Sequence, residues 1–482
     1  MLEILSHQYL KKFIKSHQND WNHIYSFGRI ISKCLQTDQN YLINSEIFFS
    51  NSWLSPLLIS LFLFQEDSIL VLSKEKIELI RKNHLEHLKS LEFQFLFDNN
   101  QIIFSNHRVL LITLENLLSD SNISRFYNHR IIFSGIENIK EDLKNYFRIL
   151  LLKKDWFNED IKTQFINQKI ISKYHFFKKK FFLRKNLDYD YILLDAKEVN
   201  SLTNFFNEYA SFSNKFQRVS DSLSEGWACW VKLDDINFEW KLFIEPLDEL
   251  SQIKKLLGNN KCLFLSALRK DNFFQKYLKK QSLKVDTVIN FKSNFNEKKI
   301  LMYIPPRQIL PNNPLFTEII LEKCKKLVMF SKGFTLILCD DTNLKMNIAT
   351  ELASQHGKRV LLETTPLRNN QILCASYGWW IKNLNLAEIP EQIIIPLLPI
   401  PDMREPINEI NVSHNKKIAK DWFREFLLPE AIEKLERSVS LLRRNSGKLI
   451  ILDGRANKRR WGRSIVKSID YSQQINYMLP FD

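Results

Sequence analysis

Short apolar runs that do not alternate with polar residues recur along this chain, and they restrict its fold more than any other sequence feature. The first series comprises residues 69–72, 102–104, 131–133, 191–194 and 263–265, each flanked by polar residues and helical patterns. Such runs are typical of strands that are buried on both faces of a parallel sheet, because crossover helices cover both faces. The sequence therefore predicts an α/β fold.

A second series of the same kind lies nearer the C-terminus, at residues 336–338, 360–362, 372–373, 393–395 and 449–452. Four prolines between residues 303 and 314 separate the two series, and proline interrupts helices and central strands. With 482 residues the chain also exceeds the usual size of one domain. We expect a first domain over residues 1–300, a linker over 301–314 and a second domain over 315–482.

Residues 140–222 have a helical pattern that is rich in phenylalanine, which predicts a helical insertion in the first domain. Within it, residues 173–185 interleave Lys and Arg with aromatic residues. One interpretation is a surface that stacks bases and binds phosphates. The other is an amphipathic helix that buries its Phe residues and exposes its Lys residues to solvent.

The chain is strongly basic, with 69 Lys and Arg against 54 Asp and Glu and a formal net charge of +15. This excess favours an anionic partner, most simply nucleic acid. A Lys-, Asn- and Ile-rich composition also arises from an AT-biased genome, so compositional drift stays open as the alternative.

Glycine is scarce: the chain has 10, and none lies between Gly28 and Gly135. A P-loop needs glycines before a Lys that is followed by Ser or Thr. The Gly-Lys pairs at 357–358 and 447–448 are followed by Arg and Leu, so the chain has no intact P-loop.

Six scattered cysteines without C-x-x-C spacing predict reduced, mostly buried thiols and no zinc or iron–sulfur site. The longest apolar run, residues 53–64, is too short to cross a bilayer. The first fifteen residues do not have the apolar core of a signal peptide. We expect a cytoplasmic protein without a membrane partner.

The C-terminal region contains five landmarks in a fixed order. They are LPEA at 428–431, the segment 435–444, Gly447, LIILDGR at 449–455 and Trp461-Gly462. Together they resemble the final motif block of the DinG-type helicases, the superfamily 2 branch that includes XPD-type repair helicases. In that family the block runs from L-P-x-A through Q-G-x-G-R-x-x-R to a strand ending in D-x-R and an aromatic-glycine pair.

Weaker similarities to the same family precede this block, at residues 105–111, 245–248, 265–268, 332–338, 372–385 and 396–402. The resemblance thus spans about residues 25–475. It implies two RecA-like parallel-sheet domains of the P-loop NTPase type, ATP and magnesium between them, and single-stranded nucleic acid across their tops. The family activity is that of an ATP-dependent DNA helicase.

Three sites that serve ATP hydrolysis depart from the family pattern. In the phosphate loop, residues 48–55, Leu54 stands in the place of Lys, and bulky Phe49 and Trp53 would block the backbone approach that glycine allows. Only Ser52 and Ser55 remain as candidate nucleotide-binding residues in this degenerate loop.

The strand that should end in D-E-A-H ends in Ser-Gly-Ile-Glu, with Glu137 at the family's His position. In the arginine motif Arg437 replaces Gln, Leu441 replaces the first Arg, and only Arg444 matches. Glu137 and Arg444 are thus the remaining catalytic candidates. The family's iron–sulfur cysteines would precede the D-E-A-H position, yet residues 35–228 contain no cysteine, so we expect no cluster.

The sequence therefore predicts a helicase-like protein that binds nucleic acid, most simply single-stranded DNA, and whose motifs for ATP hydrolysis are lost. Two alternatives stay open: an active ATP-dependent DNA helicase with unorthodox motifs, and a non-catalytic adaptor that holds a protein partner. The candidate nucleic-acid-binding residues are Lys178, Lys179, Lys180 and Arg184, with Lys185 beside them, and Lys458, Arg459, Arg460 and Arg463.

Overall fold

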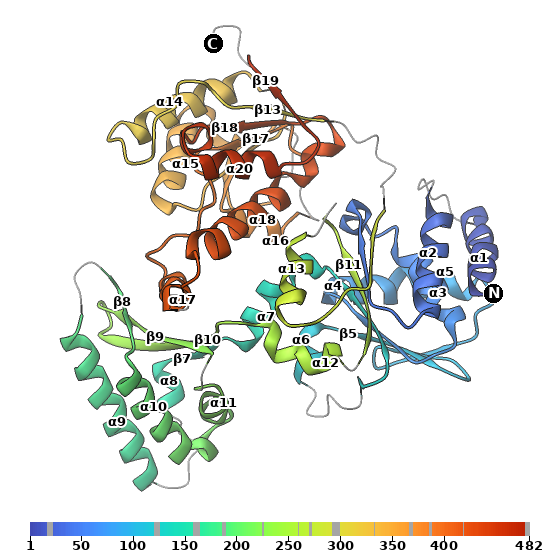
Figure 1. Cartoon of the computed structure of the whole chain (residues 1–482), viewed down its shortest axis with the longest axis horizontal. Helices are drawn as coiled ribbons and strands as arrows, with labels where there is room; N and C mark the ends of the chain where they lie inside the picture. Colours follow the sequence, from blue (N-terminus) through green and yellow to red (C-terminus); the bar gives the residue numbers. More distant parts are fainter. Residues whose placement is uncertain are drawn as a thin grey trace. The chain divides into compact units, whose positions relative to one another are not determined.

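The structure is a computed structural model of the 482-residue chain. It describes residues 1–16, 23–119, 126–157, 164–185, 189–223, 226–258, 260–268, 272–291, 299–331, 333–365, 370–384, 388–417 and 419–477. The chain divides into two compact units (Figure 1). The first comprises residues 1–137, 256–401 and 423–482, and the second comprises residues 138–255 and 402–422.

The first unit contains two sheets, and the first of them has eight strands. Their order is β12 (Thr287–Asn290), β1 (Tyr41–Asn44), β11 (Lys261–Ser266), β6 (Arg130–Ser134), β2 (Ser68–Val71), β5 (Arg108–Ile112), β4 (Gln101–Ile103) and β3 (Leu96–Asp98). All neighbours from β12 to β5 pair in parallel, whereas β4 and β3 are antiparallel. The run at 102–104 therefore lies mainly in β4, an antiparallel strand between β5 and the edge strand β3, which corrects its expected place among the parallel strands.

Helices cover both faces of this sheet. On one face, α1 (Leu2–Ser16), α2 (Ile24–Gln36) and α3 (Leu54–Phe64) pack on one another and share one apolar core with the strands (Figure 1). The shorter helices that follow are α4 (Lys74–Leu79), α5 (Leu85–Lys89) and α6 (Leu114–Ser119). On the other face, Phe264 of β11 packs on Phe274 of α13 (Asn272–Lys280). This covering explains why the strands are continuous apolar runs.

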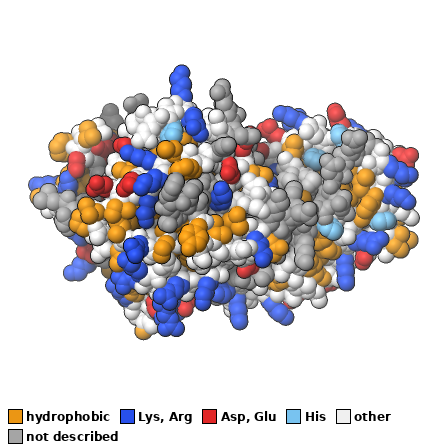
Figure 2. Space-filling model, turned by 90° about the horizontal axis from the view of Figure 1, so that it is seen from above, with side chains coloured by type: hydrophobic (Ala, Val, Ile, Leu, Met, Phe, Trp, Pro, Cys, Tyr) orange, Lys and Arg blue, Asp and Glu red, His pale blue; other side chains and the backbone are white. Residues whose placement is uncertain are grey.

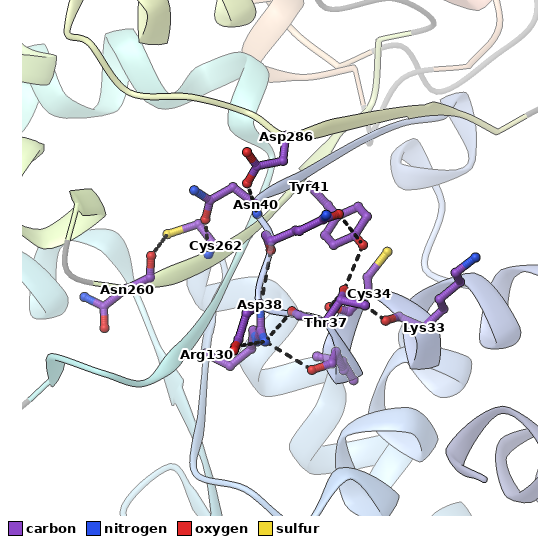
Figure 3. A network of polar contacts seen from close by, with 12 residues as sticks. Lys33, Cys34, Thr37, Asp38, Asn40, Tyr41, Arg130, Asn260, Cys262 and Asp286 are labelled. Carbon is purple, nitrogen blue, oxygen red and sulfur yellow. Dashed lines mark hydrogen bonds and ion pairs between the residues drawn. The ribbon is translucent and has the colours of Figure 1, made fainter.

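A polar network fastens the amino ends of these strands (Figure 3). The buried guanidinium of Arg130 donates hydrogen bonds to the carbonyl oxygens of Leu35 and Thr37 at 3.1 and 2.8 Å. The side chain of Asn40 accepts from the backbone of Cys262 at 2.9 Å, which ties β1 to β11. The carboxyl ends of the same strands lie at the opposite edge of the sheet.

The second sheet has seven strands, all parallel. Their order is β15 (Val360–Leu362), β16 (Ile372–Ala375), β14 (Thr335–Leu338), β17 (Gln392–Ile395), β18 (Lys448–Ile451), β13 (Ile300–Tyr303) and β19 (Ser472–Ile475). The helices α14 (Phe316–Met329) and α15 (Thr342–His356) share a core with one face. On the other face lie α16 (Tyr377–Lys382), α18 (Leu428–Val439) and α20 (Arg460–Ser468). Residues 301–303, at the start of the expected linker, belong to β13.

The second unit has an antiparallel sheet in the order β7 (Ile149–Leu151), β10 (Glu239–Pro246), β9 (Trp227–Asp234) and β8 (Tyr191–Leu193). Its helices are α7 (Ile139–Phe147), α8 (Lys153–Trp156), α9 (Gln164–Leu183), α10 (Ala196–Glu208), α11 (Asn214–Ser222) and α17 (Pro406–Lys417), and α12 (Lys254–Gly258) lies at its boundary. The expected insertion at 140–222 falls within this unit, which also contains strands and the separate segment 402–422.

The prediction that the run at 191–194 forms a parallel strand was wrong. The run forms β8 of the antiparallel sheet and not a strand of the parallel one. Residues of α8 to α11 pack on one face of this sheet, and Ile407 and Ile410 of α17 pack on the other. Because both faces are covered, β8 has the same unalternating pattern as a buried parallel strand. In the described part of the chain, no helix has the length and apolar character needed to span a membrane.

Candidate nucleotide site and basic clusters

The strands β1, β11 and β6 lie side by side in the first sheet, with Asn44 opposite Ser266 and Ser134 opposite Leu265. Their carboxyl ends therefore meet at one edge, where open α/β sheets bind their ligands. The segments that follow these strands, residues 45–55, 134–137 and 266–268, form the candidate nucleotide site. This is the place that the resemblance implies for ATP.

The segment after β1 folds into a short 3₁₀ helix, η1 (Glu46–Phe49), before α3 begins at Leu54. The backbone N–H groups of Phe48, Ser50 and Leu54 donate to carbonyl groups of the same segment, at 3.2, 2.9 and 3.2 Å. A phosphate cradle needs several N–H groups that point at the ligand. Here these three amides are already used within the loop.

Aromatic rings fill the interior of this loop. Phe48 and Trp53 are buried, and their ring centroids lie 5.3 Å apart in an edge-on arrangement. The indole N–H of Trp53 donates to the carbonyl oxygen of Ser50 at 2.8 Å, and the ammonium of Lys76 lies 5.0 Å from the indole centroid. Phe48 is thus the ring that packs on Trp53, and Phe49 packs against the cores of both the first and the second sheet.

The two candidate nucleotide-binding serines have partners inside the protein. Ser55 is 3% exposed, and its hydroxyl lies 2.9 Å from Nδ1 of His84. Burial lowers the pKa of His84 to about 4, so its imidazole is neutral at pH 7. Ser52 is partly exposed, and its hydroxyl lies 2.8 Å from that of Ser50.

After β6 the chain turns at Gly135, whose φ of +74° favours glycine. The carboxylate of Glu137 then accepts a hydrogen bond from the backbone of Ala267 at 3.0 Å, which ties the ends of β6 and β11 together. The ammonium of Lys76 donates to the hydroxyl of Ser134 at 3.4 Å. Burial lowers the pKa of Lys76, and the charge of Glu137 opposes that shift.

Lys76 is a site residue that sequence reasoning missed. Its only sequence signal is its position one turn after the apolar run at 69–72, where Ser73 caps α4. The described ranges contain no group of three His, Cys, Asp or Glu side chains that could hold a metal ion.

The arginine motif forms the end of α18 and a 3₁₀ helix, η9 (Ser440–Arg444), just before β18. The guanidinium of Arg443 lies 3.2 Å from the carboxylate of Glu46, and these two side chains are 6% and 4% exposed. The guanidinium of Arg444 lies 6.0 Å from the ring centroid of Phe49, and burial lowers its pKa. The sequence identified Arg444 by its motif position, but it missed Arg443, whose partner is distant in the chain.

In the insertion, α9 buries Tyr174, Phe177 and Phe181 in the core of the second unit. Lys180 lies 3.1 Å from Glu198, which is 1% exposed, and Arg184 forms an ion pair with the same carboxylate. Of the remaining bases, Lys178 is partly exposed and Lys179 is exposed. Lys185 pairs with Asp235 at 2.6 Å. The arrangement is that of an amphipathic helix, and two of its bases stabilise an internal carboxylate.

The second basic cluster surrounds the junction of α19 (Arg455–Lys458) and α20. Lys458, Arg459, Arg460 and Arg463 are exposed there, and in the described part of the chain none of them lies within 4.0 Å of an acidic side chain. Figure 2 shows Lys and Arg side chains spread over the face that it displays. This cluster is available to an anionic ligand.

The neighbouring landmark residues hold this junction in place. Asp453 is fully buried, forms a bidentate pair with Arg455, and accepts from the backbone of Leu398 at 2.9 Å. A Cβ atom on Gly462 would lie 2.0 Å from the carbonyl oxygen of Arg455, so only glycine fits there. Trp461 packs on Phe423 with ring centroids 5.3 Å apart.

No protein-family model and no curated protein matches the chain. Among solved structures it is similar to Xpd4 of S. tokodaii, with 12% identity over 95% of this chain and 100% of that one and a TM-score of 0.59. It is also similar to an XPD structure described as apo, with 12% identity, coverage of 94% and 100%, and a TM-score of 0.55. A third structure, described as XPD helicase, has 10% identity over 96% of this chain and 100% of that one and a TM-score of 0.56.

At these identities the likeness concerns the fold. Both sheets of the first unit are parallel except for the β4 and β3 edge, and the relatives match over almost the whole chain. The predicted α/β class and the predicted resemblance are confirmed at this level. The chain therefore has a RecA-like α/β fold that is similar to the fold of the XPD structures.

Proposed function

We propose that this protein binds single-stranded DNA on a helicase scaffold and does not hydrolyse ATP. The observation that supports the second part most directly is the closed segment 45–55. The amides of Phe48, Ser50 and Leu54 are bonded within the loop, and the rings of Phe48 and Trp53 occupy its interior. A triphosphate would have to break these contacts and expel the rings before it reached the strand ends.

The residues present do not fit a magnesium nucleotide. Leu54 is buried at the position of the phosphate-binding Lys, and Ser134 and Gly135 stand where the resemblance implies acidic residues. Phosphoryl transfer depends almost wholly on positioning and charge stabilisation, so each missing group costs orders of magnitude in rate.

DNA binding needs none of these groups. It needs a surface with exposed cations, whose contacts with phosphates release counterions. The cluster of Lys458, Arg459, Arg460 and Arg463 supplies such a surface on a fold that the XPD-type helicases share. The six free, buried cysteines support a reducing compartment, and we propose the cytoplasm.

The test is equilibrium binding of a fluorescent ATP analogue with magnesium, together with phosphate release in the presence of single-stranded DNA. We expect no saturable binding and no release above that of a blank. Turnover that DNA stimulates and that Ser55→Ala or Glu137→Ala abolishes would instead establish an active helicase. If the folded protein fails to bind DNA at low salt, the adaptor function replaces our proposal.

A further inference from the structure

Two neighbouring arginines of η9 contact two residues of η1, although the segments lie in different RecA-like domains of the first unit. Nη1 of Arg443 lies 3.2 Å from Oε1 of Glu46, 397 positions away in the chain. The guanidinium of Arg444 lies 6.0 Å from the ring centroid of Phe49. These contacts connect the segment after β1 in the first sheet with the segment before β18 in the second.

The ion pair is buried on both sides, since its side chains are 6% and 4% exposed. Arg443 is held from a second direction, because its Nη2 and Nε donate to the carbonyl oxygen of Asp470 at 3.2 and 3.4 Å. Its guanidinium is therefore fixed toward Glu46 and does not depend on that carboxylate alone for its position. A buried ion of this kind needs a partner, since an unpaired charge is very costly away from water.

Glu46 follows the carboxyl end of β1, and α/β sheets bind their ligands at the carboxyl ends of the strands. In nucleotide hydrolases an arginine at this edge pairs with the charge of the terminal phosphate. A carboxylate presents two oxygens that match the guanidinium fork in the same manner as a phosphate does. In this chain the anion that Arg443 meets is part of the protein.

We propose that Glu46 takes the place of a nucleotide phosphate, so that the Arg443–Glu46 pair and the Arg444–Phe49 contact form an internal latch. The latch holds the two segments together without any nucleotide. A site that opens and closes with ATP is thereby replaced by one that stays closed. This inference rests on the proposed absence of ATP binding and is independent of DNA binding.

The test is hydrogen exchange of the backbone amides in the two segments, 45–50 and 440–445, measured by mass spectrometry on the full chain without nucleotide. Arg443→Met removes the hydrogen-bonded guanidinium from the buried carboxylate of Glu46, so we expect exchange in the partner segment 45–50 to rise by about 100-fold. Glu46→Gln is nearly isosteric and should raise exchange in segment 440–445. It keeps the test decisive if Arg443→Met does not fold.

The double variant Glu46→Gln/Arg443→Met removes both charges of the pair together, so its exchange should lie well below the product of the two single effects. The matched control is Glu391→Gln, which removes a half-exposed ion pair with Lys448 at 3.9 Å. It should leave both segments unchanged.

Two results would overturn the latch. One is that a single variant folds but leaves exchange in the partner segment unchanged. The other is that the increase in exchange of the double variant equals the product of the two single increases. Either result would leave the DNA-binding proposal standing. Magnesium and ATP added to the wild-type protein should change neither segment. A change there would overturn the proposed loss of ATP binding, and the latch with it.

Discussion

Replacing Lys458, Arg459 and Arg460 with Ala tests whether the second basic cluster contacts DNA phosphates. All three side chains are exposed, and in the part of the chain that the structure describes none has an acidic partner. Their loss should therefore change stability by no more than about 0.5 kcal/mol. An effect on DNA affinity can then be assigned to lost contacts and not to unfolding.

The size of the effect follows from counterion release. For single strands the slope of log affinity against log salt is about −0.7 for each phosphate contact, so three lost contacts make it shallower by about 2. Over a fourfold rise in salt, the wild-type protein should lose about 20-fold more affinity than the variant. Phosphate contacts carry no sequence information, so this difference should be the same for oligonucleotides of unrelated sequence.

The assay is fluorescence anisotropy with two labelled oligonucleotides at four or more salt concentrations. A matched control removes three exposed lysines that already have acidic partners: Lys12, Lys82 and Lys326, paired with Glu92, Glu78 and Glu322. It lowers the net charge by the same amount but should change the slope much less. An unchanged slope in the cluster variant, or an equal change in the control, would refute the reasoning.

Two further predictions concern stability. Above pH 6.5 His84 is neutral in both the folded and the unfolded chain, but its folded pKa is lowered to about 4, so the unfolded state takes up the proton first as the pH falls. Wild-type stability should then drop by up to about 3 kcal/mol between pH 6.5 and 4, and urea unfolding of His84→Gln should lack this part of the drop. Arg184→Ala leaves the buried carboxylate of Glu198 with Lys180 and the backbone N–H of Asp195, which should cost about 1–3 kcal/mol in chemical unfolding and leave the DNA salt slope unchanged. A changed slope at unaltered stability would assign Arg184 to DNA.

Much of the fold could be predicted because a strand that is buried on both faces has an uninterrupted run of apolar residues. The runs at 131–133 and 263–265 form β6 and β11 at the centre of the first sheet. The run at 191–194 misled because its antiparallel sheet is also covered on both faces. The apolar pattern of a strand indicates whether both of its faces are covered, but it does not indicate which strands are its neighbours.

The candidate site divides in the same manner. That Leu54 and not Lys stands at this position could be predicted, because it is a matter of residue identity. The packing of Phe48 on Trp53 could not, since Phe48 and Phe49 are neighbours of one type and only the fold shows which of them is buried. The partner of Arg443 could not be predicted either, because the pair depends on the packing of segments 397 positions apart.

The landmarks that carried the resemblance are residues that hold segments of the backbone together, so their role does not require the nucleotide chemistry whose loss we propose. Asp453 accepts from the backbone of Leu398 and grips Arg455, and so it joins the segments that follow β17 and β18 whether or not a ligand is present. Removing it would leave the buried N–H of Leu398 and the partly buried cation of Arg455 without this partner, at a cost that does not depend on ATP. In our proposal no nucleotide contacts Leu54 or Ser134, so only the packing of the protein itself restricts these two positions.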